Sequence, residues 1–393
     1  MRDSISSSHA HRRVLHLTRD FPPRSTGGLS TAVAGLVEAS ARIGISSFVL
    51  SFDNWRPKAR PHSTDAPVLE ERDFGALVRL SEPSQLEFAL AHAQSGACDV
   101  VHVHDGMLWP FAQELRRALG LPLLYMVHVY HRRVNALRAI DEETASLRAQ
   151  ELALAEADAV LSPSYACTAS IQADYPGLHV MTARLGISLS TLKRHTDLTR
   201  THSDKEVLLY VGRFSDIKGT REFFRVAARL LSERPRLHVQ VVGGVPANMK
   251  AERRWLRQWG ALCPPGARAR VNFQPWLSSS ELSRFYQEAN VLLIPSWTET
   301  FGLVALEGML HGTPILASGC SALREMLGDG QRGSLCDARD DVALYEATTR
   351  LLDDPALAQS LGIAAATYAR ERCVWSARIR DFERAYEALL DRL

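Results

Sequence analysis

The chain has 393 residues, of which 46% are hydrophobic and 23% are charged, and its formal net charge at neutral pH is +2. This length suits two domains of ordinary size, and the composition excludes a disordered chain. No stretch approaches the ~20 apolar residues of a transmembrane helix, which argues against a membrane-spanning chain. The low net charge argues against general nucleic-acid binding, and six scattered cysteines without a Cys-x-x-Cys pair indicate reduced thiols in a cytoplasmic protein.

The first half of the chain alternates short apolar runs with helical patterns. Strands are predicted at Val14–Leu17, Ser46–Phe52, Val100–Val103, Leu123–Val127 and Ala159–Ser162, and helices at Leu29–Ile43, Pro83–Ser95, Pro110–Leu119 and Glu142–Glu156. The segment Asp53–Pro67, rich in proline and charge, is expected to be an exposed loop. This alternation predicts a parallel sheet that is covered on both faces.

The loop after the first strand ends in Gly27 and Gly28, which open the following helix. Glycine has no side chain to keep a ligand away, so the backbone amides of this loop can approach a phosphate or a sugar. A glycine pair by itself is most often only a turn. The residues alone therefore do not distinguish a turn from a binding loop.

Histidines gather at the ends of two predicted strands. His102, His104 and Asp105 end one of them, and His128 and His131 end the other. His102 and His104 point to the same side of their strand. Imidazoles and a carboxylate are ligands of zinc and iron, so a metal site is an open alternative here. No spacing fixes a third ligand, and we therefore expect no metal.

The polar stretch Leu185–Asp204 is the expected linker, and the alternation restarts after it. Further strands are predicted at Val207–Val211, Leu237–Val242, Arg270–Phe273, Val291–Ile294 and Thr313–Ser318, and helices at Thr220–Ser232, Ser280–Ala289 and Ser376–Leu390. One more helix is predicted between the strands Leu237–Val242 and Arg270–Phe273. The last helix is amphipathic. The expected architecture is α/β, with two doubly wound domains that face each other across a cleft.

Two cations lie on the loop of the run Tyr210–Gly219, which reads YVGRFSDIKG. Gly212 allows a close backbone approach at the strand's end, and Arg213 and Lys218 can together meet the growing charge of a diphosphate leaving group. The dinucleotide-binding motif Gly-x-Gly-x-x-Gly is missing from this loop. We therefore predict a phosphate-binding loop, although most such pairs are only surface cations.

The most informative run is Pro295–Gly312, which reads PSWTETFGLVALEGMLHG. Its pattern of strand, loop, helix and strand places Glu299 on the loop at the ligand-binding edge of the sheet, and Glu307 in the first turns of the helix. The residues at the helix start are Phe301, Gly302, Leu303 and Val304. Their free amides attract an anion, so the pattern suits a sugar joined to a phosphate.

This run closely resembles the Glu-x7-Glu motif of the retaining nucleotide-sugar glycosyltransferases of family 4. The Gly-Arg and Lys-Gly pairs at 212–219, the glycine loop and Val374–Trp375–Ser376 extend the resemblance over nearly the whole chain. It implies a GT-B fold of two Rossmann-like domains: residues 1–188 on the acceptor side, residues 189–375 on the donor side, and a helix at 376–393 that crosses back to the first domain.

The implied reaction moves a sugar from a nucleoside diphosphate sugar, UDP-sugar foremost, to a hydroxyl of a small molecule, lipid or glycan, with retention and without a cofactor. The resemblance assigns the donor diphosphate to Arg213 and Lys218, the ribose hydroxyls to Glu307, the sugar hydroxyls to Glu299, and the neighbourhood of the reacting centre to His128. Main-chain groups near Gly243, Gly244 and Trp276 are expected to receive the base.

Two departures and two rival functions accompany the resemblance. Gly186–Ile187–Ser188 stands where the family commonly has Gly-Ile-Asp, and Gly308 replaces a common alanine. The rivals are a sugar-nucleotide epimerase or hydrolase on the same fold, and a catalytically silent nucleotide-sugar-binding protein. The cations Arg132, Arg133 and Arg138 could face an acidic substrate or an anionic membrane surface, although such residues more often form a solvated helix face.

Overall fold

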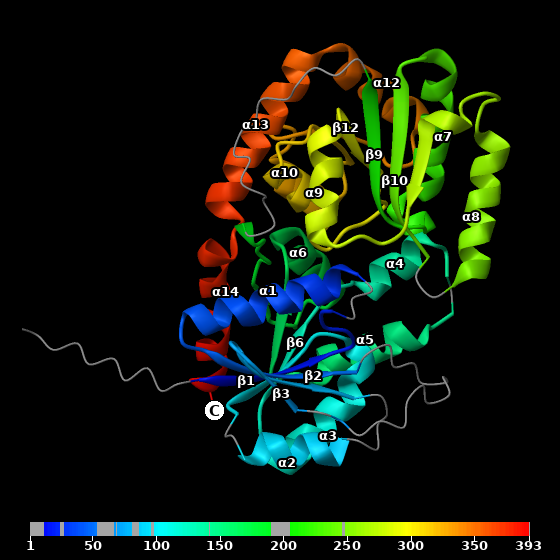
Figure 1. Cartoon of the computed structure of the whole chain (residues 1–393). Coiled ribbons are helices and arrows are strands. Elements are labelled where there is room, and N and C mark those ends of the chain that lie inside the picture. The colour runs from blue at the N-terminus through cyan, green and yellow to red at the C-terminus, as the bar shows by residue number, and fades with distance from the viewer. Residues whose placement is uncertain are drawn as a thin grey trace, which may run out of the picture.

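The computed structural model describes residues 12–23, 27–52, 67, 69–80, 86–95, 98–140, 142–189, 205–245 and 248–392. The chain forms two mostly parallel sheets, each flanked by helices, and the two sheets lie in separate halves of the molecule, one above the other in Figure 1. The final helix lies beside the first sheet (Figure 1). This arrangement confirms the predicted fold of two Rossmann-like domains. Most of the predicted loop Asp53–Pro67 and the linker residues 190–204 lie outside the described residues.

The first sheet has eight strands in the order β3-β4-β2-β1-β5-β6-β7-β8, and only the β3–β4 pair is antiparallel. Its strands are β1 (Arg13–Thr18), β2 (Ser46–Ser51), β3 (Leu69–Arg72), β4 (Gly75–Arg79), β5 (Val100–Val103), β6 (Leu123–Met126), β7 (Ala159–Ser162) and β8 (Val180–Thr182). Its helices are α1 (Gly28–Arg42), α2 (Leu86–Ser95), α3 (Trp109–Leu119), α4 (His131–Leu137), α5 (Ala145–Glu156) and α6 (Tyr165–Asp174), with the short 3-10 helix η2 (Gly106–Leu108).

The second sheet has six parallel strands in the order β11-β10-β9-β12-β13-β14. Its strands are β9 (Glu206–Arg213), β10 (Leu237–Gly244), β11 (Val271–Gln274), β12 (Val291–Ile294), β13 (Ile315–Ser318) and β14 (Ser334–Cys336). Around it lie α7 (Thr220–Glu233), α8 (Met249–Leu262), α9 (Ser279–Glu288), α10 (Leu303–Leu310), α11 (Ser321–Leu327), α12 (Asp341–Asp353) and α13 (Pro355–Arg372), with the 3-10 helices η4 (Asp216–Lys218) and η5 (Arg268–Arg270).

The strand order of the second sheet reverses between β9 and β12. On one side of this point the strands follow in the order β9, β10 and β11 toward one edge of the sheet. On the other side β12, β13 and β14 follow toward the opposite edge. Ligands of open parallel sheets bind beyond the carboxyl ends of the strands at such a switch point. Every residue of β12 is buried, as expected for a central strand with helices on both faces.

The helix α14 (Trp375–Leu390) ties the end of the chain to the first sheet. It packs against α1, where a Cβ on Gly35 would lie only 2.1 Å from the indole Nε1 of Trp375. The Tyr386 hydroxyl of α14 lies 2.9 Å from His102 Nδ1, and Arg184 pairs with Asp381 at 3.2 Å. The predicted domain limits themselves remain predictions.

The sequence patterns missed several elements that lack a strong periodic signal. The hairpin β3–β4, the strands β8 and β14, and the helices α4, α6 and α11 to α13 were not among those predicted. The predicted helix at Pro83–Ser95 is described only from Leu86, and that predicted from Glu142 begins at Ala145. Within the described part of the chain, no helix is long and apolar enough to cross a membrane.

Candidate active site

The loops that follow β9 and β12 meet at the switch point. The Trp297 amide donates to the Ile217 carbonyl at 2.8 Å, which holds the two loops together. Lys218 Nζ lies 2.6 Å from Glu299 Oε1, and Ser296 Oγ donates to the same oxygen at 2.9 Å. The two sequence motifs, 81 residues apart, therefore form one charged site.

Two glycines allow this close approach of backbones. Gly219 ends η4 in the left-handed region with φ of +64°, and a Cβ there would lie 1.9 Å from the Pro295 carbonyl oxygen. Gly243, with φ of +129°, would place a Cβ 2.0 Å from the carbonyl oxygen of Gly212. Any side chain at either position would push the ligand-side ends of neighbouring strands apart.

The predicted anion cradle lies at the start of α10. Gly302 is the N-cap, in the left-handed region with φ of +97° and ψ of 55°, and Leu303 is the first helical residue. Phe301 is buried, whereas Leu303 and Val304 are half-buried. The first amides of a helix have no acceptor within the helix, so those at the start of α10 can donate to an anion, and anion binding here remains a prediction.

Glu307 lies in the second turn of α10, on the helix as predicted, and has surroundings unlike those of Glu299. The Tyr286 hydroxyl donates to Glu307 Oε2 at 2.7 Å. Burial raises the pKa of the Glu307 carboxyl above its ordinary value, and the hydrogen bond from Tyr286 opposes that shift. One carboxylate is thus paired with a cation, and the other is held by a phenol.

The first sheet contributes His128, which follows the end of β6. The Thr300 hydroxyl, next to Glu299, donates to the His128 carbonyl at 2.6 Å, and Ser164 Oγ donates to the Thr300 carbonyl at 2.7 Å. A further bond joins the halves, from the Ala166 amide to Glu325 Oε2 at 2.9 Å. The structure therefore brings His128 beside the Glu299 loop.

The glycine loop also faces the donor-side residues. A Cβ on Gly28 would lie 2.9 Å from Leu303 Cδ1, at the start of α10, while a Cβ on Gly27 would meet no atom within 4 Å. Among the described residues, there is therefore space beside Gly27, next to the anion cradle. A larger residue at Gly28 would close that approach.

Four other predicted residues share the sheet edge without a contact to the carboxylates. Arg213 is exposed at the end of β9, and its side chain has no ion-pair partner among the described residues. Gly243 and Gly244 end β10. Trp276 follows β11 and is 40% exposed. Their roles in binding phosphate and base remain predictions.

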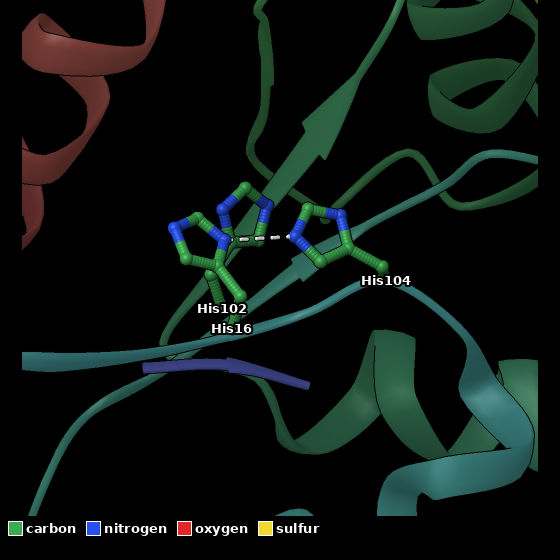
Figure 2. Close-up of side chains that lie close together, drawn as sticks. All are labelled: His16, His102 and His104. Carbon is green, nitrogen blue, oxygen red and sulfur yellow. Dashed lines mark hydrogen bonds between the residues drawn. The ribbon is translucent and has the colours of Figure 1, made fainter. Parts of the chain in front are cut away.

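The metal alternative gains a third histidine that sequence reasoning missed. His16 of β1 lies beside His102 and His104 of β5, with one ring nitrogen of each within 4.8 Å of the others (Figure 2). All three rings are buried, and burial lowers the pKa of each. These nitrogens could hold a metal ion only if the hydrogen bond between His16 and His104 were given up.

The remaining polar groups near these strands are engaged elsewhere. Asp105 caps η2 and pairs with Arg19 at 2.7 Å, so it does not complete the histidine group. Burial lowers the pKa of His131, which begins α4. Arg132 pairs with Glu151 at 2.8 Å and stacks on Tyr175.

Sequence reasoning did not find the partners that orient the predicted residues. They are Ser164, Tyr286, Ser296 and Thr300, together with His16 and Ser47. Thr300 lies between two residues that were predicted, but its contact with His128 spans 172 residues of sequence. Only the folded chain reveals such contacts, because no local periodicity encodes them.

Family models match both halves of the chain. The model of the family "Glycosyl transferases group 1" matches residues 205–354, and that of the "Glycosyl transferase 4-like domain" matches residues 27–177. A D-inositol 3-phosphate glycosyltransferase of Streptosporangium roseum is 30% identical over 330 residues, which cover 78% of this chain and 74% of that protein.

Two solved structures share the fold. The sucrose-phosphate synthase of Thermosynechococcus elongatus superposes with a TM-score of 0.82 at 22% identity, over 97% of this chain and all of that one. The Anabaena protein HepE, solved with UDP and glucose, superposes with a TM-score of 0.73 at 18% identity, over 96% of this chain and all of that one.

Proposed function

Because the chain belongs to the group 1 glycosyl transferases of family 4, with the GT-B fold, we propose that it moves a sugar from a nucleoside diphosphate sugar to an acceptor hydroxyl with retention of configuration. UDP-sugar is the preferred donor in this proposal, and the reaction takes place in the cytoplasm. The single observation that carries it is the contact of Lys218 with Glu299 beside the start of α10.

That contact places a cation, a carboxylate and free amides within one site. A donor has the matching parts: a diphosphate that needs cations and N–H donors, and sugar hydroxyls that need acceptors. In our proposal the diphosphate takes Lys218, Arg213 and the amides at the start of α10. Glu299 accepts hydrogen bonds from the sugar hydroxyls.

The other end of the donor is assigned to Glu307 and the strand ends. Glu307 accepts from the ribose hydroxyls, and the Tyr286 hydroxyl fixes the orientation of its carboxylate. Main-chain groups near Gly243 and Gly244 and the exposed Trp276 receive the base. A half-buried carboxylate suits this neutral partner, because hydroxyl donors satisfy it without a counter-ion.

Transfer in this proposal proceeds on one face of the sugar. The bond between the anomeric carbon and the diphosphate oxygen breaks as the acceptor oxygen bonds to the same carbon, and the leaving phosphate takes the acceptor's proton. A two-step route would need a carboxylate nucleophile about 5 Å from an acid. Glu299 is already bound to Lys218 and Ser296, which suits a binding role better than nucleophilic attack.

No metal or other cofactor enters this proposal, since the cations and the helix start take the leaving charge. The acceptor stays open between a small molecule, a lipid and a glycan. The names of the inositol phosphate and sucrose phosphate enzymes point to phosphorylated acceptors as the first compounds to test.

A donor screen followed by an acceptor screen tests the proposal. Nucleoside diphosphates and their sugars are first ranked by the shift in Tm that they cause, with Arg213→Ala as the variant expected to lose most of the shift. The best donor is then incubated in EDTA with and without phosphorylated polyols and sugars. A product that contains the acceptor supports transfer, free sugar alone supports a hydrolase, and binding without any product supports a silent binding protein.

A further inference from the structure

A continuous chain of buried side chains leads to His128 from the first two strands of the sheet. Ser47 Oγ lies 3.3 Å from His16 Nε2, His16 Nδ1 lies 3.0 Å from His104 Nε2, and His104 Nδ1 lies 3.0 Å from His128 Nε2. Ser47, His16 and His104 are at most 2% exposed. The other ring nitrogen of His128, Nδ1, has no hydrogen-bond partner among the described residues.

If all three imidazoles are neutral, the hydrogen bonds along this row of side chains can run in only two directions. Each ring carries one N–H, so each contact between rings needs a proton on one side and a lone pair on the other. In the first order every N–H points toward His128, which is then protonated on Nδ1. In the second order every N–H points toward Ser47, and His128 is protonated on Nε2.

The Ser47 hydroxyl decides between the two orders. Among the described residues, its side chain has one hydrogen-bond partner, His16 Nε2. In the first order the hydroxyl donates to that nitrogen and its proton is satisfied. In the second order it can only accept, and its own buried O–H is left without an acceptor. An unmade hydrogen bond of a buried donor is costly, so the first order is favoured.

We propose that Ser47, His16 and His104 are positioning residues that hold His128 in the tautomer protonated on Nδ1. His128 then offers a neutral N–H donor beside the Glu299 loop, where an oxygen of the donor sugar or its phosphate accepts it. The assignment of this oxygen rests on the proposed function, whereas the tautomer does not. Nothing in the family comparison assigns a role to Ser47 or His16.

Burial of the rings supports the neutral chain. It lowers the pKa of His16 to about 3 and that of His128 to about 4, and the pKa of His104 also lies well below its ordinary value. The chain therefore carries no extra proton at neutral pH. With Nε2 accepting from His104 and Nδ1 already protonated, His128 has no free lone pair and cannot act as a base.

The same rings offer one competing arrangement. His102 Nε2 is buried and has no partner among the described residues, while His102 Nδ1 lies 2.9 Å from the Tyr386 hydroxyl. A metal ion bound by His16, His102 and His104 would replace the hydrogen bond on which the chain depends (Figure 2). The two arrangements exclude each other and differ in metal content.

Nitrogen NMR of the whole protein labelled with ¹⁵N-histidine tests the proposal. At pH 7 the ring nitrogens of His128 should show a protonated Nδ1 and an unprotonated Nε2, with the same tautomer in His16 and His104. Ser47→Ala removes the terminal donor and should produce a mixture of tautomers at His128, while Ser47→Thr keeps the hydroxyl and the single tautomer. Ser40→Ala is the matched control, because Ser40 is also buried in this domain and its hydroxyl has no hydrogen-bond partner among the described residues.

Activity gives a second, separate readout. Equal tautomer populations in Ser47→Ala would lower turnover by about twofold, since only the competent fraction acts. A protonated Nε2 on His128 in the unaltered protein, an unchanged single tautomer in Ser47→Ala, or one bound metal ion per chain would overturn the proposal. If the tautomers are as expected but no donor and acceptor give a product, the proposed function fails and the tautomer assignment stands.

Discussion

The two cations Arg213, the last residue of β9, and Lys218, the last residue of η4, have different surroundings. Lys218 lies against Glu299, whereas Arg213 is exposed at the end of β9. Both are proposed to meet charge that grows on the diphosphate as it leaves. We expect Arg213→Ala and Lys218→Ala each to cut turnover by ~10²-fold or more, because removal of one preorganised donor costs transition-state stabilisation directly.

Arg229→Ala is the matched control for these two variants. Arg229 lies on α7 of the same domain and pairs with Glu233 at 3.2 Å on the surface. Steady-state kinetics should find it unchanged, and all three variants should unfold near the Tm of the unaltered protein. Near-normal turnover in both loop variants would contradict the assignment of the diphosphate.

Glu299 and Glu307 should separate kinetically. In the proposed function Glu299 lies beside the sugar, whose ring gains positive character as the phosphate departs, so Glu299→Gln should mainly lower kcat. Glu307 is proposed to bind the ribose equally in the ground and transition states, so Glu307→Gln should mainly raise the KM of the donor. Both constants are measured with saturating acceptor. A larger KM effect at Glu299 than at Glu307 would mean that the two roles are reversed.

The sequence alone placed Glu299 on the loop and Glu307 on the helix, whereas Arg213, which was expected on the loop, is the last residue of β9, and Lys218 lies in η4. A strand followed by a loop and a helix fixes which residues lie at the ligand-binding edge, and that pattern is local. It could not show that Ser296 and Tyr286 orient the two carboxylates, or that His16 stands behind His104. These contacts depend on strand order and register, which arise only when distant segments pack.

At the scale of elements, the turn from η4 into α7 holds the site together. Gly219 occupies the left-handed region, and a Cβ would lie 1.9 Å from the carbonyl oxygen of Pro295 at the end of β12. We expect Gly219→Ala to lower the free energy of unfolding by about 2–4 kcal/mol, because backbone strain and a backbone clash add. Chemical denaturation measures the change.

Gly120→Ala separates the clash from the strain. Gly120 ends α3 with φ of +69°, close to the +64° of Gly219, and a Cβ there would meet no atom within 4 Å. This control should cost only the strain of the left-handed conformation, about 1 kcal/mol. If the free energy of unfolding fell equally in the two variants, the contact with Pro295 would make no contribution to the effect of Gly219→Ala.

Elements with strong periodicity were predicted well, and elements defined by their neighbours were not. β12 and α10 follow from a buried apolar run and a loop. The edge strands β3 and β14 were missed, because a three- or four-residue strand of partly exposed side chains has no clear pattern. The strand order, and with it the switch point between β9 and β12, also required the folded chain.

At the scale of the whole molecule, the buried histidines make stability depend on pH. The unfolded chain takes up protons near the ordinary histidine pKa of about 6.5, whereas folding lowers the pKa of His16 to about 3 and that of His128 to about 4. The unfolded state thus binds more protons below pH 6.5, and the free energy of unfolding falls as pH drops from there toward 4.

Each such histidine should contribute a slope of up to about 1.4 kcal/mol per pH unit in that window. The raised pKa of Glu307 acts in the opposite direction, because the folded state then holds its proton more tightly than the unfolded state does. We expect His16→Gln to flatten the profile, because it removes one ring whose pKa folding lowers. Urea unfolding between pH 4 and 8 gives the slopes, and an unaltered slope in His16→Gln would contradict the buried neutral ring.

Both halves of the molecule are needed for the site, since Thr300 reaches His128 and Gly28 approaches Leu303 across the two sheets. Such an arrangement suits a reaction between a donor held by one domain and an acceptor brought by the other. We therefore propose that the sugar is transferred to a second molecule.

The most direct test is the anomeric configuration of the product formed from the best nucleoside diphosphate sugar and acceptor in EDTA. With an α-configured donor, proton NMR during the first turnovers should show an α-linked product and one nucleoside diphosphate released for each sugar transferred. A β-linked product, loss of turnover in EDTA that a divalent ion restores, or release of sugar without any linked product would contradict the account.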